Sequence, residues 1–261
     1  MTIIKGLETT FNSVYDQYDK WRPTYVKELY KTLNQFKQLN NSTSALEVGI
    51  GTGQATLPIL KTGCLVTAVE LGDKLAEYTK KKFEDYDNFN VVNCKFEEFK
   101  SIPNSYDLIF SASAFHWIPE KMGYEKVFSL LKPRGVFARF ANHPYKDKGR
   151  EEMFNAIQEL YKEYMPGSSP DDEYDDKRAK KRSDIADKYG FINTTYKLFK
   201  RTRTFTAKEY IALLGTYSDH IAIEETIRNE FFSKIERVIK DFGDEITLYD
   251  TIDLQLAIKP E

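Results

Sequence analysis

The segment 45–53, Ala-Leu-Glu-Val-Gly-Ile-Gly-Thr-Gly, limits what this chain can fold into more than any other segment. An apolar run typical of a strand passes directly into glycines at 49, 51 and 53, and a helical pattern follows at 54–60. Glycine tolerates positive φ, and its missing Cβ lets a ligand approach the backbone. The first amides of the next helix are unpaired donors. The segment predicts a ligand site at the end of the first strand of an α/β sheet; a tight turn without a ligand is the alternative.

The rest of the chain supplies strands for such a sheet. Short β-rich segments alternate with helical patterns from about residue 44 to 142, which is typical of parallel βαβ units. The predicted strands are 44–49, 65–70, 90–94, 106–112, 135–141, 195–204 and 252–258. The predicted helices are 25–39, 54–60, 74–83, one between the fourth and fifth strands, 151–165, 206–214 and 222–241. The pattern predicts a doubly wound α/β fold.

The length of 261 residues predicts a single domain, because α/β folds of this size commonly share one core. We expect that core at about 40–142 and 190–261, with an insertion at about 143–190 that forms a helical cap. Part of the insertion is polar, with an acidic half followed by a basic half. This part is typical of a surface loop, and a mobile lid over a pocket is the alternative.

Composition excludes several classes of partner. Lys and Arg number 38 against 40 Asp and Glu, so the chain lacks the basic excess that collects nucleic acid. Cys64 and Cys94 have no paired spacing, which argues against a disulfide framework and a zinc site. The sequence contains no stretch close to the roughly 18 apolar residues of a spanning helix. We expect a cytoplasmic protein with no metal, no membrane partner and no nucleic-acid partner, in an oligomeric state that the sequence does not indicate.

An acid follows the glycine turn at the spacing typical of a ribose-binding residue. Glu70 ends the second predicted strand, 19 positions beyond Gly51, and an acid at this place can bind ribose hydroxyls. A dinucleotide turn would have its third glycine at position 54, but Gln54 stands there and the glycine is Gly53. With Glu47 in the strand end, this spacing favours a nucleoside whose amino-acid half lies beside the turn. A nicotinamide cofactor is the second choice.

Several segments together resemble the class I S-adenosylmethionine-dependent methyltransferases. They are E-V-G-I-G-T-G at 47–53, V-E at 69–70, Y-D-L-I at 106–109 and L-K-P-R-G at 131–135. The resemblance covers most of 15–142, and S-A-S-A-F-H-W at 111–117 is similar to the small-molecule branch, methyltransferase type 11 and trans-aconitate methyltransferase-like proteins. It implies a Rossmann-like, mostly parallel seven-stranded sheet whose last strand is antiparallel, and S-adenosylmethionine as the cofactor.

The resemblance also implies a set of cofactor-binding residues. Glu47 and the glycines would line the methionine end, and Glu70 would bind the ribose. Where many relatives have an adenine-binding acid, this chain has Lys95, which cannot accept a hydrogen bond, followed by Phe96. In the N-terminal segment 15–25, Arg22 would hold the cofactor carboxylate. The full set is Tyr18, Arg22, Glu47, Gly49, Gly51, Gly53, Glu70, Leu71, Lys95, Phe96, Ser111 and Phe115.

The acceptor side has two candidate catalytic residues. A carboxylate acceptor is already ionised near neutral pH, whereas a phenol, an amine or an acidic carbon needs a base. His116 follows the fourth predicted strand and His143 follows the fifth, on the edge where ligands bind; each could instead serve only in packing. His220 is expected to be an inert loop residue. Arg201 and Arg203, on the sixth strand, face either an anionic acceptor or solvent.

The sequence thus predicts a methyltransferase that acts on a small molecule, with a carboxylate or another oxygen nucleophile as the acceptor. A nicotinamide-dependent oxidoreductase and a non-catalytic cofactor-binding module are the alternatives. A methyltransferase acting on RNA or protein is a further alternative, favoured only by the Lys and Arg residues at 177–182.

Overall fold

The computed structural model describes residues 15–145, 149–168 and 172–261 and contains one seven-stranded sheet. Its order is β3-β2-β1-β4-β5-β7-β6, with β1 to β5 parallel and β7 antiparallel to both of its neighbours. The strands are β1 (Ser44–Val48), β2 (Leu65–Glu70), β3 (Phe89–Asn93), β4 (Tyr106–Ala112), β5 (Leu131–Tyr145), β6 (Ile192–Phe205) and β7 (Ile246–Ile258). The predicted fold class and mostly parallel sheet are confirmed.

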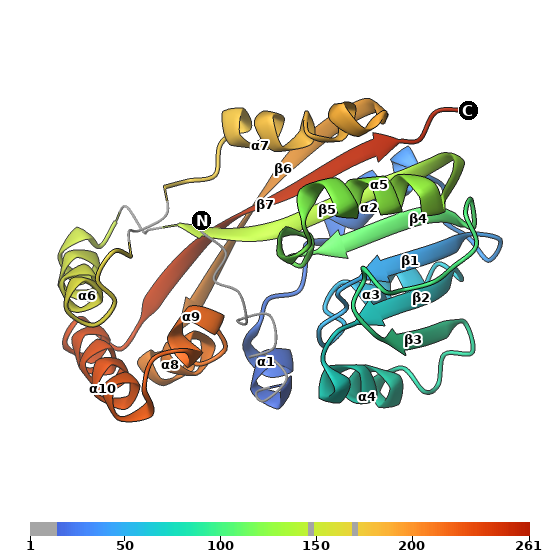
Figure 1. The fold of residues 1–261 in the computed structure, drawn as a ribbon. Helices are drawn as coiled ribbons and strands as arrows, with labels where there is room; N and C mark the ends of the chain where they lie inside the picture. The colour runs from blue at the N-terminus through green and yellow to red at the C-terminus, as the bar shows by residue number, and fades with distance from the viewer. Residues whose placement is uncertain (1–14, 146–148, 169–171) are drawn as a thin grey trace.

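Helices cover both faces of the sheet (Figure 1). Successive residues of a strand point to opposite faces, so Leu108 packs with α2 residues in one buried cluster and Ile109 with α5 residues in another. The helices of this part are α1 (Tyr15–Trp21), α2 (Lys27–Phe36), α3 (Thr56–Leu60), α4 (Asp73–Lys82) and α5 (Glu120–Leu130), with a 3₁₀ turn η2 (Phe115–Trp117) after β4. Burial on both faces explains why these strands are nearly continuous apolar runs.

A third buried cluster lies beyond the strand ends, where α6 (Glu151–Tyr164) packs with α8 (Ala207–Leu214) and α10 (Glu225–Asp241). The short helix α9 (Ser218–Ile221) belongs to the same group, and α1 contacts both α4 and α8. The other helix of the predicted insertion, α7 (Asp176–Ser183), packs against β6 and β7, and the 3₁₀ turn η3 (Ala186–Tyr189) follows it. The cap cluster therefore combines insertion residues with helices that come after β6.

The strands β5, β6 and β7 run further than predicted. Ala112, the last residue of β4, pairs with Phe140, but β5 continues to Tyr145 and stays paired with β7. We call the part of β5, β6 and β7 beyond this pair the sheet extension. It carries polar side chains such as Asn142 and His143, so its apolar pattern ends before its strands do.

The helix predicted at 25–39 begins later, at Lys27. Val26 has an extended backbone, and the ring of Tyr25 packs edge-on against Phe140 at 4.7 Å. This tertiary contact keeps Tyr25 outside the helix. None of the helices in the described ranges combines the length and the apolar character needed to cross a bilayer.

Candidate functional site

The glycine turn has the backbone that its sequence predicts, with φ of 74° at Gly49, 59° at Gly51 and 82° at Gly53. A Cβ at Gly49 would lie 2.5 Å from the Cβ of Ala114, and one at Gly53 would lie 2.5 Å from the ring of Phe83. At Gly51 the nearest atoms would be Tyr18 Cε1 at 3.9 Å and Gln54 Oε1 at 4.0 Å. Packing itself requires Gly49 and Gly53, whereas a Cβ at Gly51 would make only ordinary contacts with Tyr18 and Gln54, so at Gly51 the positive φ is what favours glycine.

Glu70 joins the glycine turn to the end of β2. Its Oε2 accepts a hydrogen bond from Gly51 N at 2.9 Å, and its Oε1 accepts one from Gly72 N at 2.9 Å. Burial raises the pKa of Glu70, while these backbone bonds oppose that shift. Asn93 Nδ2 donates to the carbonyl oxygens of Glu70 and Leu71 and so fixes the strand end. The predicted proximity of the acid and the turn is therefore present, and the role of Glu70 towards a ribose stays a prediction.

Glu47 is fully buried beneath the turn. Thr56 Oγ1 donates to its Oε2 at 2.7 Å, and its Oε1 has no hydrogen-bond partner among the described residues. Burial raises the pKa of Glu47 to about 8. A buried acid with an unpaired oxygen at this place fits a cationic group, such as the ammonium of an amino acid, because the cation would favour the ionised form.

Tyr18 and Arg22 connect the N-terminal segment to the cap. Arg22 Nε donates to Thr216 Oγ1 at 2.9 Å, and Arg22 Nη2 donates to Thr216 O at 2.7 Å. The guanidinium lies over the rings of Tyr18 and Tyr217, at 4.9 and 4.2 Å from their centroids. Arg22 therefore holds α1 against the loop between α8 and α9, and its role towards a cofactor carboxylate stays a prediction.

The remaining predicted cofactor contacts are of two kinds. Lys95 is exposed. By contrast, Phe96 is buried in the core cluster under α5, Ser111 Oγ donates to Val48 O at 2.7 Å, and Phe115 packs on Phe137 at 4.9 Å. The last three side chains fix the strand ends around the site, and their direct contact with a cofactor stays a prediction.

On the acceptor side, His143 contacts a buried acid of the neighbouring strand. His143 Nε2 lies 2.7 Å from Asp253 Oδ1, and its ring stacks on Tyr174 at 3.8 Å with 6° between the planes. Asp253 is fully buried, and its Oδ2 accepts a hydrogen bond from Gln255 Nε2 at 2.7 Å. Arg182 Nη1, from α7, lies 3.7 Å from the same oxygen.

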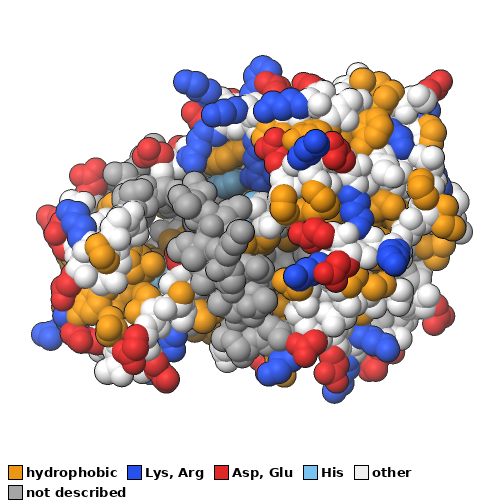
Figure 2. Space-filling model, in the orientation of Figure 1, with side chains coloured by type: hydrophobic (Ala, Val, Ile, Leu, Met, Phe, Trp, Pro, Cys, Tyr) orange, Lys and Arg blue, Asp and Glu red, His pale blue; other side chains and the backbone are white. Residues whose placement is uncertain are grey.

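His116 lies in η2 beside Trp117, with ring centroids 4.8 Å apart. Desolvation lowers the pKa of His116, as do the nearby charges of Arg182, Arg139 and His143. The structure therefore brings both predicted histidines to one region, and Figure 2 shows a histidine set back in a hollow behind Lys and Arg side chains. Sequence reasoning missed Arg139 and Asp253; a charged residue inside an apolar strand was the available signal.

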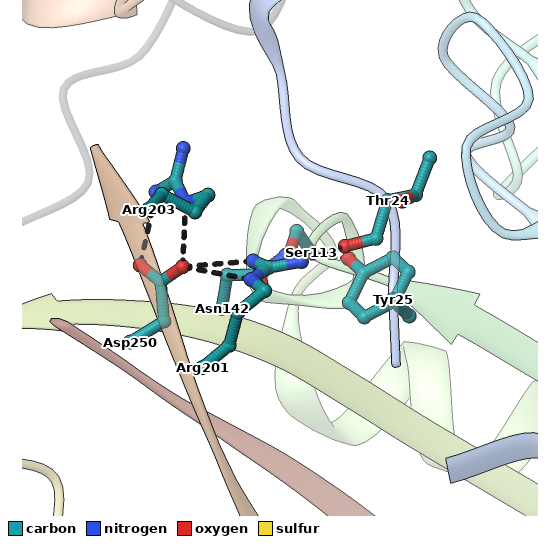
Figure 3. Close-up of polar contacts among 7 residues, drawn as sticks. All are labelled: Thr24, Tyr25, Ser113, Asn142, Arg201, Arg203 and Asp250. Atoms are coloured by element: carbon teal, nitrogen blue, oxygen red, sulfur yellow. Dashed lines mark hydrogen bonds and ion pairs between the residues drawn. The ribbon is translucent and has the colours of Figure 1, made fainter. Parts of the chain in front are cut away.

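The opposite face of the sheet extension holds a second buried acid, Asp250 (Figure 3). Arg203 binds it in a bidentate manner, through Nε at 2.7 Å and Nη2 at 2.9 Å. Arg201 Nη2 donates to Asp250 Oδ2 at 2.8 Å and to Asn142 Oδ1 at 2.6 Å, and Arg201 Nη1 donates to Thr24 O. Both arginines thus bind groups of the protein itself. The sequence had predicted that they face either an anionic acceptor or solvent.

The sequence predicts that His220 is an inert loop residue, but the structure places it in a helix. It lies in α9, is 3% exposed and contacts Asp219 Oδ1 at 2.8 Å through Nδ1. Its Nε2 lies 2.8 Å from the hydroxyl of Tyr161 on α6. His220 belongs to the packing of the cap and is separate from the other two histidines.

Known proteins match this chain in sequence and in fold. The methyltransferase domain family matches residues 45–135. An uncharacterized methyltransferase of Schizosaccharomyces pombe is 23% identical over 88% of this chain and 87% of the relative. A protein of Anaeromyxobacter dehalogenans, assigned as a type II methyltransferase, superposes with a TM-score of 0.64 at 18% identity, covering 92% of this chain and 99% of that one.

A second solved structure is Haemonchus contortus phosphoethanolamine N-methyltransferase 2 in complex with phosphomonomethylethanolamine and S-adenosylhomocysteine. It superposes with a TM-score of 0.58 at 13% identity, over 99% of this chain and 61% of that one. At such identities, the structures show a shared fold. Three findings point to the same conclusion, a methyltransferase: the family match, the order of the strands in the sheet, and the contact of Glu70 with the glycine turn. None of them supports a nicotinamide-dependent oxidoreductase or a non-catalytic module. Residues 45–135 thus match a methyltransferase domain, and the chain is an S-adenosylmethionine-dependent methyltransferase.

Proposed function

We propose that this methyltransferase transfers the methyl group of S-adenosylmethionine to a small molecule bound between the end of β4 and the sheet extension. The observation that carries the proposal is the bond from Gly51 N to Glu70 Oε2, at a glycine with positive φ and no close neighbour at its Cβ position. The acid and the turn are already in contact, so the cofactor needs no rearrangement of the strands.

Different residues at the turn bind different parts of the cofactor. Glu70 accepts hydrogen bonds from the ribose hydroxyls in place of Gly51 and Gly72, and the unpaired oxygen of Glu47 faces the ammonium. Arg22 and Tyr18 cover the turn from α1. The bound cofactor supplies a methyl group on a sulfonium, which an acceptor nucleophile attacks. The protein then has to align that acceptor and exclude water.

The acceptor side supports an oxygen nucleophile, either a carboxylate or a hydroxyl. His116 and His143 flank this region, and the guanidinium charges of Arg139 and Arg182 reach His116. These charges favour an acceptor that is anionic or becomes anionic. The near-neutral chain, with a formal charge of −2, supports a small molecule in preference to a nucleic acid. The free thiols of Cys64 and Cys94 support a cytoplasmic location.

Calorimetric titration with S-adenosylmethionine tests the cofactor site. We expect Glu70→Ala and Gly51→Val to lose measurable binding, because one removes the ribose acceptor and the other puts a strained side chain into the turn. Glu77→Ala changes an exposed glutamate of α4 and serves as the matched control, with wild-type affinity. Circular dichroism would verify that each variant is folded. Unchanged affinity in both site variants would show that the cofactor binds elsewhere.

A further inference from the structure

The ring of His143 is held in one orientation by two contacts. Nε2 bonds Asp253 at 2.7 Å, and the ring lies parallel to Tyr174 at 3.8 Å. A carboxylate partner places the proton on Nε2 and leaves the lone pair on Nδ1. Within residues 15–145, 149–168 and 172–261, Nδ1 of His143 has no hydrogen-bond partner, and the side chain is 24% exposed. Nδ1, the nitrogen that can act as a base, is therefore the one that does not contact Asp253.

Asp253 is placed to support a positive charge on that ring. It is fully buried on β7, and Gln255 Nε2 occupies its second oxygen at 2.7 Å. Among the described residues, the other charged or titratable groups around His143 are Tyr174, Arg182 on α7, Arg139 on β5 and His116 on η2. A carboxylate in this position stabilises an imidazolium without becoming protonated itself.

His143 lies beyond the end of β4, at a distance that leaves room for an acceptor. Phe140 is the last residue of β5 that pairs with β4, and His143 is three residues further along the strand. At about 3.3 Å per residue, this places His143 roughly 10 Å beyond the end of β4. A small aromatic molecule between these points spans that distance.

We infer that Asp253 and His143 form a general-base pair and that the acceptor is an acidic hydroxyl, a phenol or an enol. The inference rests on the proposed function and narrows its acceptor class. A carboxylate is ionised already and needs no base, and an aliphatic alcohol gives up its proton to imidazole far less readily than an acidic hydroxyl does. A phenol, with a pKa of about 10, is an acid that imidazole can deprotonate during methyl transfer.

The step balances with groups already named. The proton of the acceptor hydroxyl passes to Nδ1 of His143, and the oxygen lone pair forms the new bond to the methyl carbon. The electron pair of the broken carbon–sulfur bond stays on sulfur, which gives S-adenosylhomocysteine. Asp253 opposes the imidazolium charge, while Arg139 and Arg182 favour the negative charge that grows on the acceptor oxygen before transfer.

Three probes test the inference, with radiolabelled S-adenosylmethionine as methyl donor. They are assayed at about pH 8 and are 4-hydroxybenzoate, whose phenol is still mostly protonated there, 4-nitrophenol, whose phenol is mostly ionised there, and 4-methoxybenzoate, which offers only a carboxylate. We expect methyl ethers from both phenols. His143→Ala and Asp253→Asn should lower turnover of 4-hydroxybenzoate about 100-fold, and turnover of 4-nitrophenol less than about fivefold, since an ionised acceptor needs no base.

The control variant is Lys177→Gln, which removes an exposed charge from α7 and should change neither rate. Cofactor affinity, measured by calorimetry, should stay within about twofold of wild type in every variant, because the pair does not touch the glycine turn. Raising the pH towards that at which 4-hydroxybenzoate ionises should restore part of the lost turnover, which damage to the fold would not allow.

Equal losses on the two phenols would overturn the general-base role. Ester formation from 4-methoxybenzoate at a rate similar to that of ether formation would overturn the acceptor class, and so would the absence of any phenol product from protein that binds the cofactor. A wild-type protein that does not bind S-adenosylmethionine would instead contradict the proposed function. The two failures are therefore distinguishable.

Discussion

Two aspartates of β7, Asp250 and Asp253, are both fully buried but have different partners. They lie three residues apart, so they face opposite sides of the sheet extension. Asp250 binds the guanidinium groups of Arg201 and Arg203. Asp253 binds His143 and Gln255, with Arg182 at a longer distance.

The comparison shows that the partner of a buried acid, more than its burial, indicates its role. Guanidinium groups stay charged at every relevant pH, so the contacts of Asp250 are permanent. Through Arg201 they also tie Thr24 and Asn142 to β6 and β7. An imidazole can gain or lose a proton near neutral pH, so the contact of Asp253 can take part in a reaction. Asp250 holds the extension together, and for Asp253 we propose a part in the reaction.

The largest effect that separates the two acids is expected on stability. Asp250→Ala leaves two partly buried guanidinium groups without their anion, and we expect it to cost about 3–5 kcal/mol. Asp253→Ala should cost less, about 1–3 kcal/mol, because His143 can be neutral and Arg182 is partly exposed. Urea unfolding measures both values. Asp241→Ala, an exposed residue, is the control, and similar losses in the two site variants would refute the distinction.

The arginines should divide in the same way. Arg201→Ala removes bonds to Asp250, Asn142 and Thr24, so we expect a loss of about 1–3 kcal/mol in urea unfolding. Arg182→Ala removes a partly exposed contact of 3.7 Å, worth about 1 kcal/mol or less. Its expected effect is on turnover, where a charge beside the acceptor oxygen is lost. A greater loss of stability from Arg182→Ala than from Arg201→Ala would reverse the comparison.

Glu47 extends the comparison to a buried acid without a cation. With a pKa of about 8 in the free protein, Glu47 is mostly protonated at pH 7. If the cofactor ammonium requires the ionised form, affinity should rise up to about tenfold per pH unit between pH 6 and 8 and level off above. Calorimetry across pH measures this dependence. Glu47→Gln should bind weakly with little pH dependence, and a flat wild-type profile would contradict the assignment.

The same raised pKa sets the sign for stability. The folded protein holds the Glu47 proton more tightly than the unfolded chain does, and this adds to the free energy of unfolding. The added stability is fully present below about pH 4.5. It is lost as the pH rises to about 8, and Glu47→Gln should remove that slope from the urea unfolding of the free protein.

Sequence reasoning predicted the contact between the glycine turn and Glu70, because that contact is local. Gly51 and Glu70 belong to one βαβ unit, so their spacing along the chain determines their proximity. The start of α2 and the ends of β5 and β7 were placed less accurately. Tyr25 is kept out of its helix by a contact with Phe140, and the extension continues through polar residues that give no apolar signal.

The sequence by itself determined the fold class and the turn that the cofactor requires, since positive φ, a short strand and the next strand end are properties of neighbouring residues. Only the tertiary structure decided which buried acid meets a histidine. His143 and Asp253 are 110 residues apart, and the antiparallel pairing of β5 with β7 brings them together. A shift of one residue in that pairing would turn Asp253 to the other face, because side chains alternate along a strand.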